Sequence, residues 1–91
     1  MIYEQARDQI IAAIHFTTGA LNKEGVANKL AKPDGDMDFA EFDLDSLAAM
    51  EMCLEIEDKT GIEIDLGDLA QHPSVNALAK FMVGRAPADA T

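Results

Sequence analysis

The chain has 91 residues, a mass of 9.8 kDa and 48% hydrophobic residues, enough for one small domain with a single core. It has 7 Lys and Arg against 17 Asp and Glu, so its net charge of −10 excludes nucleic acids and anionic lipid surfaces as partners. No apolar run approaches the roughly 20 residues that span a bilayer, and a signal-peptide pattern is absent, so membrane insertion is not expected. The single cysteine, Cys53, excludes an internal disulfide, and we expect a cytoplasmic protein.

The first half of the chain predicts one helix and a long connection. Apolar residues recur at three- and four-residue intervals from Tyr3 to about Thr17, which indicates an amphipathic helix that ends before Gly19. Residues 19–43 contain several Gly and Asn residues and the turn sequence Pro33-Asp34-Gly35-Asp36. We therefore predict a long connection here, with a helical turn near residues 24–30. Connections of this length often carry function.

The second half predicts a main helix, a short one and a last helix. Good helix formers follow Asp45-Ser46 up to Thr60, and Gly61 stops the helix. The segment 62–64 alternates like a strand but has no partner strand, so we predict an extended loop. A short helical turn is expected at 67–70, and Ser74 is expected to cap a last helix that runs through Val83. The prediction is one domain at 1–85 and a fraying tail at 86–91.

The predicted helix at 45–60 carries two apolar stripes on opposite sides, at 100° per residue. The first stripe contains Ala49, Met52, Cys53, Ile56 and Thr60, and we assign it to the core. The second contains Leu47, Met50 and Leu54, and is bordered by Glu51, Glu57 and Asp58. A helix that buries one stripe exposes the other, so we predict an apolar patch inside an acidic rim, typical of a transient protein interface. The alternative is that Met50 and Leu54 pack under the long connection.

The acidic residues are concentrated in the same region. Thirteen of the seventeen lie between Asp34 and Asp68, opposed there by Lys59 alone. Such a field attracts proteins with basic surfaces, although a solubilising face is the alternative.

Ser46 at the start of the predicted helix at 45–60 has two interpretations. Its hydroxyl can cap the helix, or it can be a modification site, since the free amides of a helix N-terminus favour a phosphate ester.

Several segments together resemble the acyl carrier protein family. They are Phe42-Asp43-Leu44-Asp45-Ser46-Leu47, the helix sequence up to Asp58, Gly61-Ile62-Glu63-Ile64 and Pro73-Ser74-Val75-Asn76-Ala77-Leu78. The resemblance spans about Asp38 to Val83 and implies an all-α four-helix bundle, three main helices plus one short, with a long first loop. Two positions depart from the family pattern, since Asp43 stands where many relatives have Gly and Thr60 where an aromatic residue is frequent.

The resemblance also implies a function. Ser46 would receive a 4′-phosphopantetheine arm from coenzyme A through a phosphopantetheinyl transferase, and Asp45 would help to position the magnesium-bound coenzyme. The thiol of the arm would hold an acyl cargo as a thioester, and the chain itself would catalyse nothing. An acyl or aminoacyl ligase would load this monomeric carrier, and downstream acyl-transferring enzymes with basic surfaces would contact its second stripe and acidic rim.

The nature of the cargo has alternatives. A specialised fatty acid or polyketide carrier is the main interpretation, and a stand-alone aminoacyl or peptidyl carrier is the second. The third is an unmodified acidic adaptor that binds basic partners through the 45–60 helix.

Other chemistry is not supported by the residue patterns. Asp34, Asp36 and Asp38 imitate the first ligands of a calcium loop, but Phe39 stands where the loop needs Gly. His15 and His72 lie far apart in sequence and beside no other ligand at metal-binding spacing, so we expect no metal site. Ser46 lacks the Gly-x-Ser-x-Gly elbow of a hydrolase, and Cys53 is expected to be a small buried hydrophobic residue.

Overall fold

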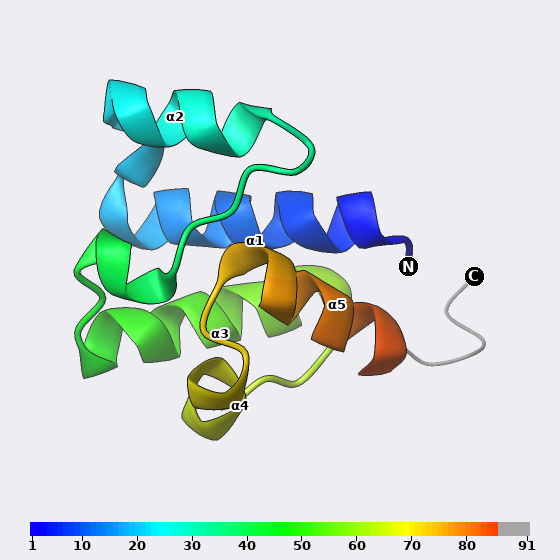
Figure 1. The fold of residues 1–91 in the computed structure, drawn as a ribbon. Coiled ribbons are helices and arrows are strands. Elements are labelled where there is room, and N and C mark those ends of the chain that lie inside the picture. The colour runs from blue at the N-terminus through cyan, green and yellow to red at the C-terminus, as the bar shows by residue number, and fades with distance from the viewer. Residues whose placement is uncertain (86–91) are drawn as a thin grey trace.

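Helix α1 (Tyr3–Thr18) is the element on which the other helices assemble (Figure 1). The computed structural model describes residues 1–85, and the predicted tail at 86–91 lies outside them. One side of α1 is fully buried and packs against both α3 (Ser46–Thr60) and α5 (Val75–Arg85). The buried residues of α1 are Ala6, Arg7, Ile10, Ala13 and Ile14. The predicted first helix is confirmed, and Gly19 ends it in the left-handed conformation with φ of 69°.

The first connection contains more regular structure than the sequence predicted. A 3-10 turn (η1, Ala20–Asn22) leads into α2 (Glu24–Ala31), an eight-residue helix on the opposite side of α1 from α3 (Figure 1). Leu30 is buried and Val26 packs against the core, so α2 is stabilised by the face that these two residues share. Gly25 and Asn28 have low intrinsic helix propensity, which explains why the sequence pattern indicated only a single turn.

The predicted all-α architecture is confirmed, although it has five α-helices among residues 1–85 where the prediction had four. After α2 the chain crosses α1 and forms a second 3-10 turn, η2 (Phe39–Phe42), which leads into α3 (Figure 1). The short helix α4 (Leu66–Gln71) and the last helix α5 follow. Ser74 caps α5 as predicted, since its Oγ accepts from the amide of Ala77 at 3.1 Å.

The segment between α3 and α4 is extended, as predicted, and it belongs to no strand. Ile62 and Ile64 are both buried, whereas Glu63 between them is exposed. An extended backbone places alternate side chains on opposite sides, so the strand-like alternation of this segment reflects packing of two isoleucines onto the helices. Within residues 1–85 no helix has the length and hydropathy needed to cross a membrane.

The turn after α2 packs closely against the end of that helix. A Cβ atom added to Gly35 would lie 1.8 Å from the carbonyl oxygen of Lys29, so only glycine fits this position without a backbone shift. The amide of Gly35 donates to the carbonyl of Lys32 at 3.0 Å, which closes the turn. The sequence Pro33-Asp34-Gly35-Asp36 is therefore a tightly packed turn.

We predict that Gly35→Ala lowers the free energy of unfolding by about 1–3 kcal/mol, because the added methyl overpacks the turn. Gly25→Ala is the matched control, since a Cβ there meets nothing within 4 Å and the residue lies in α2. It should raise the free energy of unfolding by about 0.5–1 kcal/mol. Urea unfolding of both variants checks this, and equal effects would contradict the packing argument.

Candidate functional site

Ser46 is the first residue of α3, and its side chain is exposed. The cap of this helix is Asp45, whose Oδ1 accepts from the amide of Ala48 at 2.7 Å. The interpretation of Ser46 as the N-cap was therefore wrong by one residue. Since Asp45 already caps the helix, the Ser46 hydroxyl is not needed for that structural role.

The chain contains two serines, which differ in exposure and in hydrogen bonding. Ser74 is only 8% exposed, and its Oγ accepts a hydrogen bond at the start of α5. Ser46 is exposed at the start of α3, beside the amides of Ser46 and Leu47, which have no acceptor within a helix that begins there. An acceptor group on the Ser46 oxygen would lie close to these amides and to the positive end of the α3 dipole.

The backbone that leads to Ser46 takes a sharp bend at Asp43. This residue has φ of 54°, in the left-handed region, and its amide donates to the carbonyl of Ala40 at 3.4 Å. Glycine is favoured in that conformation, which explains why many members of the resembled family carry Gly here. Aspartate is among the residues that tolerate it, so the departure from the family pattern preserves the bend.

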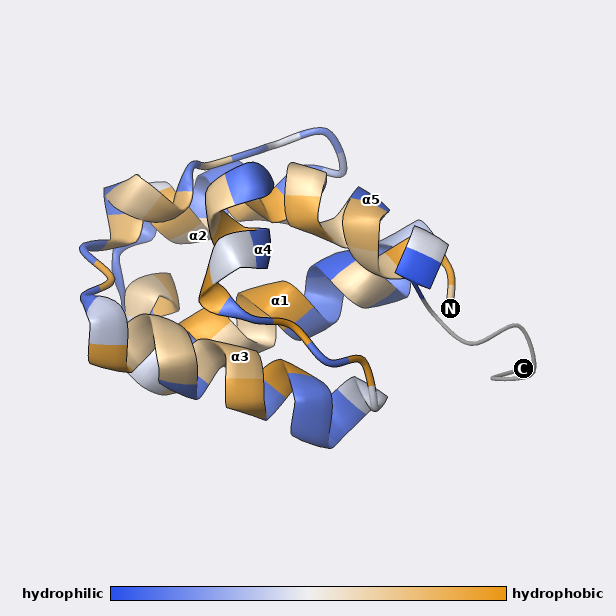
Figure 2. Cartoon of the chain, turned by 90° about the horizontal axis from the view of Figure 1, so that it is seen from below, coloured by the Kyte–Doolittle hydropathy of each residue, from blue (hydrophilic) through white to orange (hydrophobic). Residues whose placement is uncertain are grey.

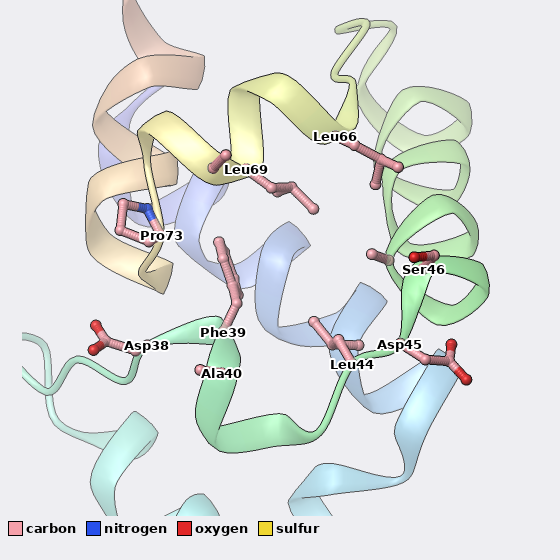
Figure 3. A pocket seen from close by; sticks show the side chains of 11 residues that line it. Asp38, Phe39, Ala40, Leu44, Asp45, Ser46, Leu66, Leu69 and Pro73 are labelled. Carbon is pink, nitrogen blue, oxygen red and sulfur yellow. The ribbon is translucent and has the colours of Figure 1, made fainter.

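A groove of about 430 Å³ begins beside Ser46 and runs between η2, the start of α3 and α4 (Figure 3). Most of its lining is apolar, and the carboxylates of Asp38 and Asp45 point away from it in Figure 3. The lining residues are Asp38, Phe39, Ala40, Leu44, Asp45, Ser46, Ala49, Leu66, Leu69, Ala70 and Pro73. The exposed hydroxyl thus lies at the edge of a groove that suits an organic group.

The outer side of α3 exposes the second apolar stripe. Leu47 is 66% exposed, Met50 is 50% exposed and Leu54 is 63% exposed, which confirms the predicted exposure and shows that the connection does not cover them. In Figure 2 apolar and polar positions alternate along this helix. Leu66 at the start of α4 is 42% exposed and lies across a pit from Met50 and Leu54. Leu66 was not predicted from the sequence because it belongs to a different helix.

The acidic rim of this patch is largely uncompensated. Lys59 lies 3.8 Å from Glu55 and 3.8 Å from Asp58, and these are the ion pairs found within residues 1–85. Glu51 and Glu57 are exposed and have no such partner in that part of the chain. Pairs as exposed as these contribute little to stability, so the main effect of the acids is a negative field around the patch.

The pit beside the patch contains the thiol-bearing residue of the chain. It has a volume of about 230 Å³ and is lined by Met50, Cys53, Leu54, Ile64, Asp65 and Leu66. Cys53 is buried, as predicted from its place in the first stripe. Burial, with smaller contributions from Asp65 and Asp68, raises the pKa of the Cys53 thiol from its usual 9.0 to about 11. The thiol is therefore protonated at neutral pH and is a poor nucleophile.

Three other polar residues considered from the sequence, Asp36, His15 and His72, have structural contacts. Within residues 1–85 no cluster of His, Cys, Asp and Glu could hold a metal ion. Instead, Asp36 accepts from the amides of Met37 and Asn76, both at 2.9 Å. His15 accepts from the amide of Leu21 at 3.2 Å, and His72 stacks on Phe81 with ring centroids 4.4 Å apart.

Comparison with known proteins identifies the family of the chain. Residues 24–82 match the family described as "Phosphopantetheine attachment site". The chain belongs to this family. This carrier is also 39% identical over 69 residues to one of the subunits of the phenolphthiocerol/phthiocerol polyketide synthase, in Mycobacterium tuberculosis and in Mycobacterium bovis. The match covers 70% of the carrier but 4% of each relative, so it spans a small part of their length. No solved structure matches the carrier significantly.

Family membership makes the protein a phosphopantetheine-bearing carrier, with 4′-phosphopantetheine as its covalent prosthetic group. The residues present fit such a group. A phosphate ester suits the free amides at the start of α3, and the apolar groove beside Ser46 suits the organic remainder of the arm. When bound, the group supplies a terminal thiol that carries the cargo as a thioester. The carrier's own Cys53 is buried and unsuited to that role.

We predict that the Cys53 thiol makes the stability of the carrier fall between about pH 9 and pH 11. In this window the unfolded thiol ionises while the folded thiol stays protonated, so rising pH favours the unfolded state. Urea unfolding at pH 8, 9, 10 and 11 should show a steeper loss for the wild type than for Cys53→Ala. Every other titratable group is present in both proteins. Parallel profiles of unfolding free energy against pH would therefore contradict the raised pKa of Cys53.

Proposed function

We propose that Ser46 is the residue to which the phosphopantetheine arm is attached. The observation that carries this proposal is the contrast between the two serines, since Ser46 is exposed at a helix start while Ser74 is buried in a cap. In the transfer, the Ser46 oxygen attacks the phosphorus of coenzyme A that bears pantetheine. The bond from that phosphorus to the nucleotide breaks, adenosine 3′,5′-bisphosphate leaves, and the Ser46 proton passes to a base of the transferase.

Asp45 has two roles in this proposal. Its Oδ1 caps α3 through Ala48, which keeps the first turn of the helix ordered and Ser46 presented on its surface. Its carboxylate is exposed and points away from the groove in Figure 3. It can therefore face a transferase and help to position the magnesium ion that accompanies coenzyme A.

The exposed face of α3 is the proposed docking surface for partner enzymes. Leu47, Met50 and Leu54 supply apolar contact, and Leu66 extends the patch onto α4. Glu51, Glu57 and Asp58 border the patch and steer partners with basic surfaces toward it. The pit between α3 and α4 can accept one apolar side chain from such a partner. The phosphopantetheinyl transferase, the loading ligase and the downstream acyl-transferring enzymes would all use this face.

The proposed cargo is an acyl group of the polyketide type. The support is that the relatives are subunits of a polyketide synthase, which favours this cargo over the aminoacyl alternative. The carrier would perform no chemical step on the cargo, since the thiol that holds the cargo belongs to the arm and its own Cys53 is buried and protonated. We propose that the carrier works in the cytoplasm, since the thiol of the arm requires a reducing compartment. That it is a monomer stays a prediction.

Ser46→Ala should abolish modification without loss of the fold. We predict that incubation with coenzyme A, magnesium and a broad-specificity phosphopantetheinyl transferase adds the mass of one arm to the wild type and none to Ser46→Ala. Intact-mass spectrometry measures this. Ser74→Ala is the matched control, which should still be modified although it loses about 1 kcal/mol of stability with the cap. Modification of Ser46→Ala would refute the site, and an unmodified wild type would favour the adaptor.

Charge reversal on the outer face of α3 should slow modification. We predict that Glu51→Lys with Asp58→Lys lowers kcat/KM of the transferase by about tenfold at low ionic strength, and by less as salt screens the charges. The control is Glu4→Lys with Asp34→Lys, which changes the net charge equally but on exposed residues away from α3. If both double variants slow the reaction to the same extent, the effect is that of net charge and not of a docking surface.

A further inference from the structure

Arg7 is a buried cation whose partners come from three separate parts of the chain. It lies in α1 and is 6% exposed. Its Nη1 donates to the carbonyl of Leu30 at 2.9 Å, and its Nη2 donates to the carbonyls of Lys32, at 3.0 Å, and Gly35. Its Nε donates to Oδ1 of Asn76 in α5 at 2.9 Å. One guanidinium thus connects α1, the end of α2 with the turn that follows, and the start of α5.

The acceptors of Arg7 are neutral, and within residues 1–85 no carboxylate pairs with it. A buried charge is tolerated only when hydrogen bonds compensate the loss of water. Here the carbonyls at the negative end of the α2 dipole provide that compensation. The planar fork of arginine reaches all four oxygens at once, which the point charge of a lysine cannot do.

Asp36 extends the hydrogen-bond network of Arg7 to the junction between α4 and α5. Its Oδ1 accepts from the amide of Asn76, the same residue whose side chain accepts from Arg7. We call Arg7, Gly35, Asp36 and Asn76 the Arg7 clasp. Next along the chain, the amide of Val75 donates to the carbonyl of Met37 at 3.1 Å. The clasp therefore fixes where the chain enters the segment that leads to Ser46.

The last bond of this series lies at the groove. The amide of Phe39 donates to the carbonyl of Pro73 at 2.8 Å, and both residues line the groove beside Ser46. Phe39 begins η2, which forms one wall of that groove opposite α4 (Figure 3). Hydrogen bonds between residues 36–39 and 73–76 thus link Arg7 to the wall that faces Ser46.

We propose that Arg7 is a positioning residue for the reaction at Ser46. This inference rests on the proposed attachment of the arm to Ser46. With the clasp formed, residues 36–39 lie against the α4–α5 junction, and the start of α3 is presented in one arrangement. Without the clasp, this segment samples other arrangements. Only a fraction of the molecules then presents Ser46 in the arrangement that the transferase binds. A transferase that binds that fraction then shows a raised KM, while kcat for the bound carrier stays the same.

The test compares Arg7→Lys with Ile10→Val, a core truncation in the same helix that leaves the clasp intact. Ile10→Val controls for loss of thermal stability, and all reactions run well below both melting temperatures. We expect Arg7→Lys to raise KM for the transferase about tenfold with kcat changed less than about twofold, whereas Ile10→Val changes neither. Amide exchange at Met37, Phe39, Val75 and Asn76 should become about tenfold faster in Arg7→Lys, with the middle of α3 unaffected.

The outcomes separate the two proposals. Equal KM values for Arg7→Lys and Ile10→Val overturn the positioning role, and so does unchanged exchange at the four amides. If the wild type gains no arm, the proposed function itself fails, which is visible before any variant is compared. Should Arg7→Lys not fold, Asn76→Ala removes only the acceptor of Arg7 Nε. It should raise KM in the same direction by a smaller factor, and an unchanged KM would overturn the inference.

Discussion

The packing of α3 on α1 is the contact on which the rest of the molecule depends. Met52, Cys53 and Ile56 are the buried residues of α3, which packs against α1. Because a helix has only one side for the core, this contact forces Leu47, Met50 and Leu54 outward into solvent. The same contact places the start of α3 at the surface, where Asp45 caps it and Ser46 is exposed. Core packing and presentation of the site are thus consequences of one helix orientation.

The first connection shows how a polar, glycine-containing segment can still be well ordered. The apolar side chains that it buries are Ala20, Leu30, Met37, Phe39 and Phe42. Hydrogen bonds add to this packing, because the guanidinium of Arg7 binds three carbonyls of the connection and the backbone of the connection pairs with the α4–α5 junction. Within residues 1–85 no buried side-chain nitrogen or oxygen lacks a partner, so this polar arrangement is fully satisfied.

The parts of the site that the sequence predicted are those encoded by local spacing. The two stripes of α3 follow from its 3.6-residue period, and the helix start follows from Asp45-Ser46 and the run of helix formers after it. Two local details differ between the prediction and the structure. Of the two interpretations of Ser46, the capping one is wrong, because the neighbouring Asp45 caps α3. The helix α2 was predicted as a single turn because Gly25 and Asn28 have low helix propensity, and packing against distant residues stabilises it.

The sequence by itself determined the all-α class, the exposed face of α3, the cysteine on the core side and the family resemblance around Ser46. These features depend on periodicity, charge and short motifs, which are properties of neighbouring residues. Only the tertiary structure decided that Leu66 joins the patch, that Ser46 opens onto an apolar groove, and that Arg7 connects α1 with Leu30 and Asn76. Such contacts join residues up to 69 positions apart, and the free energy of burying a charge or an apolar side chain depends on which distant atoms surround it.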